Sequence, residues 1–156
     1  MNDKGGTILQ FDSAKHSWWR KPLVVFNGRS LPAELVILFM ELSAGENGVW
    51  LNSQGLQSGV VDLIASPETT GSYVTRREPL PSFAAEALKR LYQATSVKRG
   101  CPDLVIWNVR TRKIRLVEVK CPHWDRPTKE QELFLRAAQT AGVPAKIVEW
   151  EFRGAI

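Results

Sequence analysis

The chain has 156 residues, enough for one domain with a hydrophobic core of its own. Its apolar fraction of 44% and charged fraction of 24% are ordinary for a globular protein, and its net charge of +5 favours an anionic partner such as nucleic acid. Two cysteines are too few for a secreted disulfide scaffold, the start of the chain has no apolar signal core, and the longest apolar run, residues 35–40, is too short to span a bilayer. We therefore expect a soluble protein that is not secreted and that works in the cytoplasm, or in the nucleus of a eukaryote.

The first half of the chain carries one strong helix signal. Residues 30–45, SLPAELVILFMELSAG, place a continuous apolar run between a start signal and a stop signal. Ser30 can cap this helix, Pro32 suits its first turn, and a glycine lies just past its end. The remaining segments predict, in order, an irregular stretch over 1–29 with a short strand at 23–26, a strand and turn over 48–55, and a loop-rich region over 56–81.

The second half has clearer signals. Residues 82–94 predict a helix that Ser82 caps and that carries its small and apolar side chains on one stripe. Residues 103–109 and 114–120 are rich in β-forming side chains and flank the basic turn at 110–113. This pattern is typical of a β-hairpin.

The end of the chain predicts a helix and a last strand. Residues 127–142 form the helix, with Thr128 and Gln131 as a capping box and a glycine at its end. Residues 145–152 form the strand. The element order predicts an α/β fold, in which helices flank a small mixed sheet within one domain over residues 30–156.

The predicted hairpin gathers charge at one end. If it turns near residue 111, facing positions sum to about 222, and Asp103 lies opposite Val119, one residue from both Glu118 and Lys120. Glu118 and Lys120 point to the same face, because side chains alternate along a strand. They interrupt an apolar run that reads as a buried strand, where a charge is costly, although a solvated pair on an edge strand is the alternative.

Two carboxylates and an amine at one place suit metal-assisted hydrolysis of a phosphodiester. Mg²⁺ is held by one or two carboxylates together with waters and substrate oxygens. It neutralises charge on the transferring phosphoryl group and lowers the pKa of a bound water. A lysine beside it can orient that water and offset developing negative charge.

The segment GCPDLVIWNVRTRKIRLVEVKCP, residues 100–122, resembles the VRR-NUC branch of the PD-(D/E)xK nuclease superfamily, as found in the C-terminal nuclease module of Fanconi-associated nucleases. The pattern is a PDLV strand, a short basic turn, an LVEVK strand, an Asp-Arg dipeptide, and a helix with a glutamine near its start. The resemblance implies a restriction-endonuclease-like core. It also implies that Asp103, Glu118 and the main-chain carbonyl of Val119 bind metal, and that Lys120 serves the attacking water.

Two further site residues follow from the resemblance. Gln131 matches the family's additional polar residue, although its place in the capping box competes with that role. Glu34 is our candidate for the glutamate of the family's opening helix, and its alternative role is to complement the helix dipole. Glu86 competes with Glu34, although an ion pair with Arg90 one turn along the helix would explain it equally.

The stretch after the lysine departs from the family pattern. Cys121 stands where the family has glycine, and HWDRPT, residues 123–128, carries one residue more than the usual link. Pro127 replaces an apolar residue that is common there. We expect these differences to reshape the rim of the site and to leave Asp103 and its partners in place.

Basic residues and cysteines surround the hairpin. Lys98, Arg99 and Arg126 lie at the charged end and are expected to contact DNA phosphates. The cations of the turn, Arg110, Arg112 and Lys113, lie at the other end, where we expect them to be solvated. Cys101 and Cys121 face each other in the same register, and we expect packed, reduced thiols rather than a disulfide or a zinc site with His123.

The sequence therefore predicts a Mg²⁺-dependent nuclease that cleaves DNA phosphodiesters, with Mn²⁺ able to replace Mg²⁺. Branched, flapped or junction DNA is the expected substrate, and either a homodimer or a protein partner that supplies specificity is compatible with the chain. The rival interpretation is a non-catalytic nucleic-acid-binding or protein-docking module on the same fold. An intact Asp103, Glu118 and Lys120 set favours the enzyme, because a binding module has no need of it.

Overall fold

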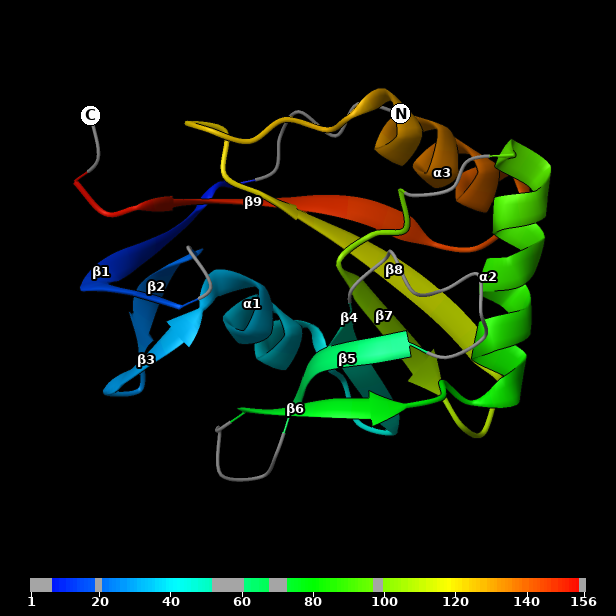
Figure 1. The fold of residues 1–156 in the computed structure, drawn as a ribbon, viewed down its shortest axis with the longest axis horizontal. Helices are drawn as coiled ribbons and strands as arrows, with labels where there is room; N and C mark the ends of the chain where they lie inside the picture. Colours follow the sequence, from blue (N-terminus) through cyan, green and yellow to red (C-terminus); the bar gives the residue numbers. More distant parts are fainter. Residues whose placement is uncertain (1–6, 19–20, 52–60, 68–72, 97–99, 155–156) are drawn as a thin grey trace.

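The computed structural model describes residues 7–18, 21–51, 61–67, 73–96 and 100–154. Within these residues the strands form one continuous nine-stranded sheet that curls around a helix (Figure 1). No helix in this part of the chain is both long and apolar enough to cross a membrane. In chain order the elements are β1 (Leu9–Trp18), β2 (Lys21–Phe26), β3 (Arg29–Pro32), α1 (Ala33–Glu41), β4 (Glu46–Leu51), β5 (Val61–Pro67), β6 (Tyr73–Glu78), α2 (Ser82–Thr95), β7 (Leu104–Asn108), β8 (Lys113–Lys120), α3 (Lys129–Thr140) and β9 (Ala145–Phe152).

The hairpin of β7 and β8 lies at the middle of the sheet. The strand order is β3-β2-β1-β9-β8-β7-β4-β5-β6. The β8–β9 and β1–β9 pairs are parallel, and the other pairs are antiparallel. β7 and β8 therefore have a neighbour on each side, which explains why their apolar residues run almost continuously.

Each face of the central strands packs on its own hydrophobic core. α1 lies inside the curl of the sheet, where Leu35 and Leu38 pack with Val117 and Val119 of β8. α2 and α3 cover the opposite face, where Leu88 and Phe134 pack with residues such as Leu116. Because side chains alternate along β8, Glu118 and Lys120 point to the face that α2 and α3 cover.

The predicted α/β class is confirmed, but the sheet is much larger than the small one expected. The short strand expected at 23–26 is part of β2, but residues 9–18 and 29–32 also form strands, so the expectation of an otherwise irregular segment over 1–29 was wrong. β1 pairs with β9 at the other end of the chain, and a local sequence pattern cannot predict a partner so distant in the sequence. The loop-rich region predicted over 56–81 also contains strands, namely β5 and β6.

Two predicted helix starts were also wrong. Ser30 lies in β3, and α1 begins only after Pro32, which has an extended backbone. Ser82 is the first residue of α2 and makes no cap, since Pro81 precedes the helix without a side-chain hydrogen bond. The β7–β8 hairpin, α3 with its capping box, and β9 over 145–152 are confirmed.

Candidate active site

The register of the hairpin differs by one residue from the predicted register. Leu104 faces Val117 and Asn108 faces Lys113, so continuing the pairing places Asp103 opposite Glu118 rather than Val119. A one-residue change decides which face a side chain occupies. The observed register is the one that puts Asp103 and Glu118 on the same face.

Asp103 is fixed by main-chain contacts just before β7 begins. Its Oδ2 accepts a hydrogen bond of 2.9 Å from the Val119 amide, and its carbonyl accepts one of 3.0 Å from Leu51 in β4. Two neighbouring strands therefore hold this half-buried aspartate. The Val119 amide fixes Oδ2, and the carboxylate as a whole neighbours that of Glu118.

Glu118 is fully buried, with 0% of its surface exposed. Its Oε2 has no hydrogen-bond partner among the residues that the structure describes. Burial and the neighbouring carboxylate of Asp103 raise the pKa of Glu118 to about 10, and the ammonium of Lys120 offsets this only in part. In its ionised form, an orphaned carboxylate oxygen beside a second carboxylate is unfavourable unless a cation is bound between them.

Lys120 is held between two carboxylates. Its Nζ lies 3.5 Å from Glu118 Oε1 and 3.3 Å from Asp125 Oδ1, and its side chain is 7% exposed. The turn after β8 returns Asp125 to the lysine, because the Asp125 amide donates a 2.9 Å hydrogen bond to the Cys121 carbonyl. Sequence reasoning missed Asp125, although it noted the Asp-Arg dipeptide that contains it.

Gln131 fills both of the roles that were expected to compete. Its Oε1 accepts a 2.9 Å hydrogen bond from the Thr128 amide, which completes the capping box of α3. Its Nε2 lies 3.4 Å from Glu118 Oε1 and donates to it. The capping box therefore orients the amide toward the glutamate, and the predicted conflict does not exist.

Gly100 allows α3 to approach this closely. Its φ of +118° lies in a region that favours glycine, and a Cβ there would come within 2.7 Å of the Glu130 carbonyl oxygen. The chain entering β7 thus passes directly against the first turn of α3. Any other residue at position 100 would push Gln131 away from Glu118.

These side chains, which we call the Glu118 cluster, fit a divalent cation. The cluster consists of Asp103, Glu118, Lys120, Asp125 and Gln131, and the ammonium of Lys120 contacts the carboxylates of Glu118 and Asp125. Hard cations such as Mg²⁺ prefer one or two carboxylates with waters completing the shell. No three Asp, Glu, His or Cys side chains gather into a closed metal cage in the described parts of the chain. The donor set is that of an open site made by Asp103 and Glu118, in which the lysine separates Asp125 from the pair.

The two candidate glutamates lie on different helices. Glu34 is buried in the first turn of α1, and it does not join Asp103 and Glu118 in a cluster of three carboxylates among the described residues. Its place in the site stays a prediction. Glu86 is exposed on α2 and lies 3.9 Å from Arg90 one turn away, which is the alternative role that its spacing suggested.

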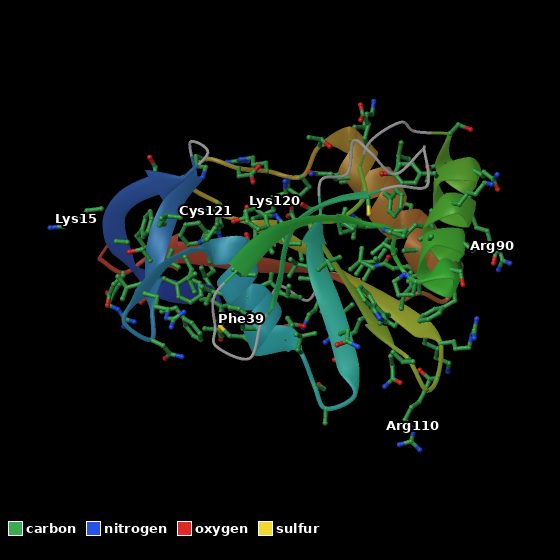
Figure 2. All side chains as sticks on the ribbon, turned by 60° about the horizontal axis from the view of Figure 1, so that its bottom comes forward. Lys15, Phe39, Arg90, Arg110, Lys120 and Cys121 are labelled. Atoms are coloured by element: carbon green, nitrogen blue, oxygen red, sulfur yellow. The ribbon has the colours of Figure 1, made fainter. Side chains whose placement is uncertain are left out.

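Of the basic residues, Arg126 and Arg110 lie at opposite ends of the hairpin, as expected. Arg126 is exposed and directly follows Asp125 at the charged end. Arg110 lies at the far end from Lys120 (Figure 2). Lys98 and Arg99 lie outside the described residues.

The cysteines do not face each other. Cys101 belongs to the core under α2 and α3, whereas Cys121 belongs to the core around α1. Both thiols are free and buried, so the expectation of packed, reduced thiols is confirmed. Burial raises the pKa of Cys101, and the nearby charges of Glu118 and Asp103 raise it further.

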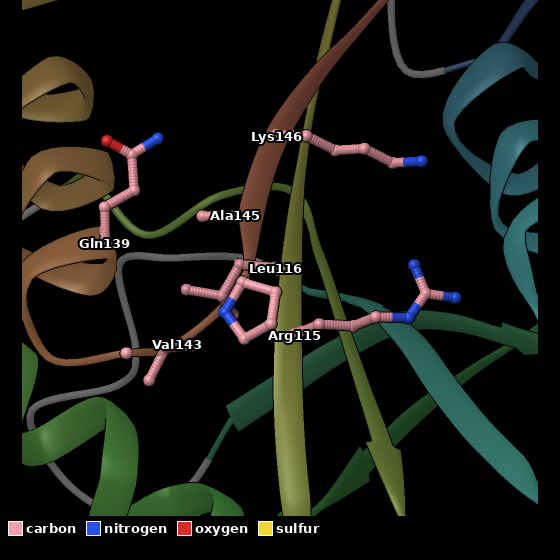
Figure 3. A pocket seen from close by; sticks show the side chains of 8 residues that line it. Arg115, Leu116, Gln139, Val143, Ala145 and Lys146 are labelled. Carbon is pink, nitrogen blue, oxygen red and sulfur yellow. The ribbon is translucent and has the colours of Figure 1, made fainter. Parts of the chain in front are cut away.

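A second charged group, which we call the Arg115 cluster, occupies the opposite end of β8. Arg115 contacts Glu46 at 2.8 Å and 2.9 Å and Glu41 at 2.8 Å, and Lys146 lies 2.9 Å from Glu41. Figure 3 shows the side chains of Arg115 and Lys146 extending from β8 and β9 in the same direction. They line a pocket at the end of α3, but their charges are already paired with Glu41 and Glu46, so this pocket is not the site.

Comparison with known proteins confirms the predicted resemblance. Residues 74–150, just under half of the chain, match the VRR-NUC domain, and every member of the Glu118 cluster lies in this segment. Fanconi-associated nuclease 1 of Ailuropoda melanoleuca is 44% identical over 48 residues, and that of Homo sapiens is 42% identical over 48 residues. Each alignment covers 31% of this chain and 5% of the relative, so the chain spans only a small part of those proteins.

Solved structures also match this chain, among them the following two. They are complexes of paFAN1 with gapped 5′-flap DNA, one with a two-nucleotide flap and one with a one-nucleotide flap. Each is 26% identical to this chain with a TM-score of 0.37, and the alignment covers 49% of this chain and 14% of that chain.

Proposed function

We propose that this chain is a divalent-metal-dependent DNA nuclease of the VRR-NUC type that hydrolyses phosphodiester bonds in branched or flapped DNA. The observation that carries the proposal is the fully buried Glu118, which lies beside Asp103 and Lys120 and whose Oε2 has no partner in the described part of the chain. This arrangement is costly for the fold alone and useful for binding a metal and a phosphate. The match of residues 74–150 to the VRR-NUC domain supports the same reaction.

The residues of the Glu118 cluster would have different roles in the reaction. Asp103 and Glu118 would hold Mg²⁺ or Mn²⁺, with the main-chain carbonyl of Val119 as a further ligand. When bound, the ion would neutralise phosphoryl charge and lower the pKa of a bound water. Lys120 orients the attacking water and stabilises negative charge on the phosphate. Its own position depends on Asp125, which accepts a hydrogen bond from Nζ at 3.3 Å.

Positioning residues complete the site. Gln131 donates to Glu118 Oε1 and so directs that carboxylate. Arg126, exposed beside Asp125, would contact a phosphate of the bound strand, and Lys98 and Arg99 are proposed for the same role. Glu34 is proposed as the glutamate of the opening helix. We also propose that the chain works in the cytoplasm or nucleus, as a homodimer or with a partner protein.

Cleavage of a DNA panel tests this function. Linear, 5′-flapped and four-way DNA would be incubated with Mg²⁺, Mn²⁺ or EDTA, with the wild-type chain, Glu118→Ala and Lys120→Ala. Lys146→Ala, which changes an exposed lysine of the Arg115 cluster, is the matched control. We expect cleavage by the wild type and the control, and loss of cleavage in the other variants and in EDTA.

Two results would contradict the proposal. No cleavage of any substrate by the folded wild-type chain would exclude a nuclease, and DNA binding that persists in EDTA would then indicate a binding module. Cleavage that is unchanged in both variants would place the chemistry elsewhere.

A further inference from the structure

Trp124 is an exposed aromatic residue in the turn after β8, one residue before Asp125 of the Glu118 cluster. It is 56% exposed, whereas the other aromatic side chains that the structure describes are buried or half-buried. An indole in water is unfavourable, since a ring of this size normally buries most of its apolar surface. Its exposure therefore calls for an explanation other than core packing.

The ring is nevertheless held in a fixed position. It packs edge-to-face on Trp150, with ring centroids 5.6 Å apart, and contacts Phe152 at 5.9 Å. The Trp124 amide donates a 3.2 Å hydrogen bond to the Cys121 carbonyl. The preceding His123 contacts Glu151 at 3.0 Å, which ties the turn to β9. A ring oriented in this way loses little conformational entropy when a ligand stacks on it.

The position of Trp124 along the chain connects it to the catalytic lysine. The next residue, Asp125, lies 3.3 Å from Lys120 Nζ, and the residue after it is the exposed Arg126. An aromatic surface, the anchor of the catalytic lysine and an exposed cation thus occupy consecutive positions. Proteins that bind single-stranded nucleic acid combine stacking rings and cations in the same manner.

We propose that Trp124 stacks on an unpaired nucleobase next to the phosphate bound at the Glu118 cluster. The inference rests on the proposed nuclease function and deepens it by naming what the site selects. A base inside a duplex has both faces covered by its neighbours, whereas a base in a flap or at a junction can offer one face to the indole. The contact therefore favours DNA with an unpaired nucleotide beside the cleaved bond, whatever its base, because every base has a π-face.

Binding and cleavage of DNA with single abasic sites test the proposal. The wild-type chain, Trp124→Ala and Trp124→Phe would be compared on 5′-flap DNA in which one nucleotide at a time, on either side of the cleaved bond, lacks its base. Binding would be measured by fluorescence anisotropy in Ca²⁺, and cleavage in Mg²⁺. Val109→Ala is the control, since Val109 is a similarly exposed apolar residue, 59% exposed, in the turn at the far end of the hairpin.

We expect Trp124→Ala to raise the Kd and the KM for base-bearing flap DNA about tenfold and to change kcat little. Trp124→Phe should recover most of the affinity, because a smaller ring still stacks. One abasic position should weaken binding by the wild type to a similar degree and leave Trp124→Ala unaffected. A merely structural role of Trp124 would not produce this dependence on a base.

The alternative outcomes separate the two proposals. A wild-type chain that cleaves flap DNA but binds every abasic substrate equally well would overturn the stacking role alone, even if Trp124→Ala failed to fold. A wild-type chain that prefers a base at one position but never cleaves would contradict the nuclease function and retain the stacking. A wild-type chain that binds no DNA would overturn both.

Discussion

Two charged clusters lie at opposite ends of β8 and differ in whether their carboxylates are paired with cations. In the Arg115 cluster, every carboxylate has a cation within 2.9 Å, and hydrogen bonds from Arg115 lower the pKa of Glu46 to about 2. In the Glu118 cluster, burial and Asp103 raise the pKa of Glu118 to about 10, and one of its oxygens has no partner among the described residues. The first cluster stabilises the fold as it is. The second keeps a buried carboxyl oxygen unsatisfied among the described residues.

The largest expected effect comes from making Glu118 neutral without changing its shape. Glu118→Gln should lower the cleavage rate by about 10³-fold or more, because the metal loses a carboxylate ligand. The same change should stabilise the metal-free protein by about 1 kcal/mol or more, since a buried carboxylate no longer has to be accommodated beside Asp103. Cleavage assays and urea unfolding in EDTA measure the two effects. A variant that is both active and less stable would show that Glu118 is an ordinary structural residue.

Removing the cation of the Arg115 cluster should lower the stability of the protein and leave the cleavage rate nearly unchanged. Arg115→Met removes the cation between Glu41 and Glu46 and should cost about 2 kcal/mol of stability, a value reduced by the 24% exposure of the arginine side chain. The kcat of cleavage should stay within about twofold of wild type in conditions where the variant is folded. Urea unfolding and single-turnover cleavage provide the two numbers. A large loss of kcat in a folded variant would mean that the two clusters are coupled.

Asp125→Asn should have an intermediate effect within the Glu118 cluster. The amide can still accept a hydrogen bond from Lys120 but no longer carries the charge that holds the ammonium, so kcat should fall roughly tenfold with little change in stability. Asp12→Asn, an exposed aspartate paired with Arg153, is the matched control and should have no effect on cleavage. An unchanged kcat in Asp125→Asn would show that Lys120 is positioned without this contact.

The smallest effect is the acid sensitivity of the Arg115 cluster. Since the pKa of Glu46 falls from 4.5 to about 2 on folding, its contribution is fully present above pH 4.5 and is lost as the pH falls toward 2. Glu46→Gln should therefore be less stable than wild type by about 1 kcal/mol or more at pH 6. This difference in the free energy of unfolding should shrink to nearly zero near pH 2. Urea midpoints measured across this range test the sign. A difference that is independent of pH would mean that charge is not what Glu46 contributes.

Elements with complete local signals could be predicted from the sequence. α3 has a capping box and a terminal glycine, and β9 has a short β-rich run with clear ends, so both were located correctly. β1 could not be found in this way. It forms a strand because it pairs with β9, which lies near the opposite end of the chain. The sequence near β1 is polar and glycine-containing, and only the tertiary partner makes it a strand.

The sequence named charged and polar residues that the structure places together, namely Asp103, Glu118, Lys120 and Gln131, but it did not give their geometry. The turn of the hairpin spans Val109–Arg112, and Asn108 Oδ1 accepts hydrogen bonds from the amides of Arg110 and Thr111. Recognising Asn108 as the residue that begins the turn would have corrected the register by one residue. The contact of Asp125 with Lys120 depends on the turn that returns from Cys121, and the sequence around it gives no comparable signal.

Direct measurement of metal binding tests the central claim that Glu118 is left unsatisfied so that a divalent cation can bind. Calorimetric titration of Mn²⁺ into the DNA-free chain would compare wild type with Glu118→Gln and with Glu46→Gln, a carboxylate of the Arg115 cluster. We predict that wild type and Glu46→Gln bind Mn²⁺ with equal affinity and that binding is lost in Glu118→Gln. Equal binding by all three proteins, or no binding by any of them at millimolar Mn²⁺, would contradict the account.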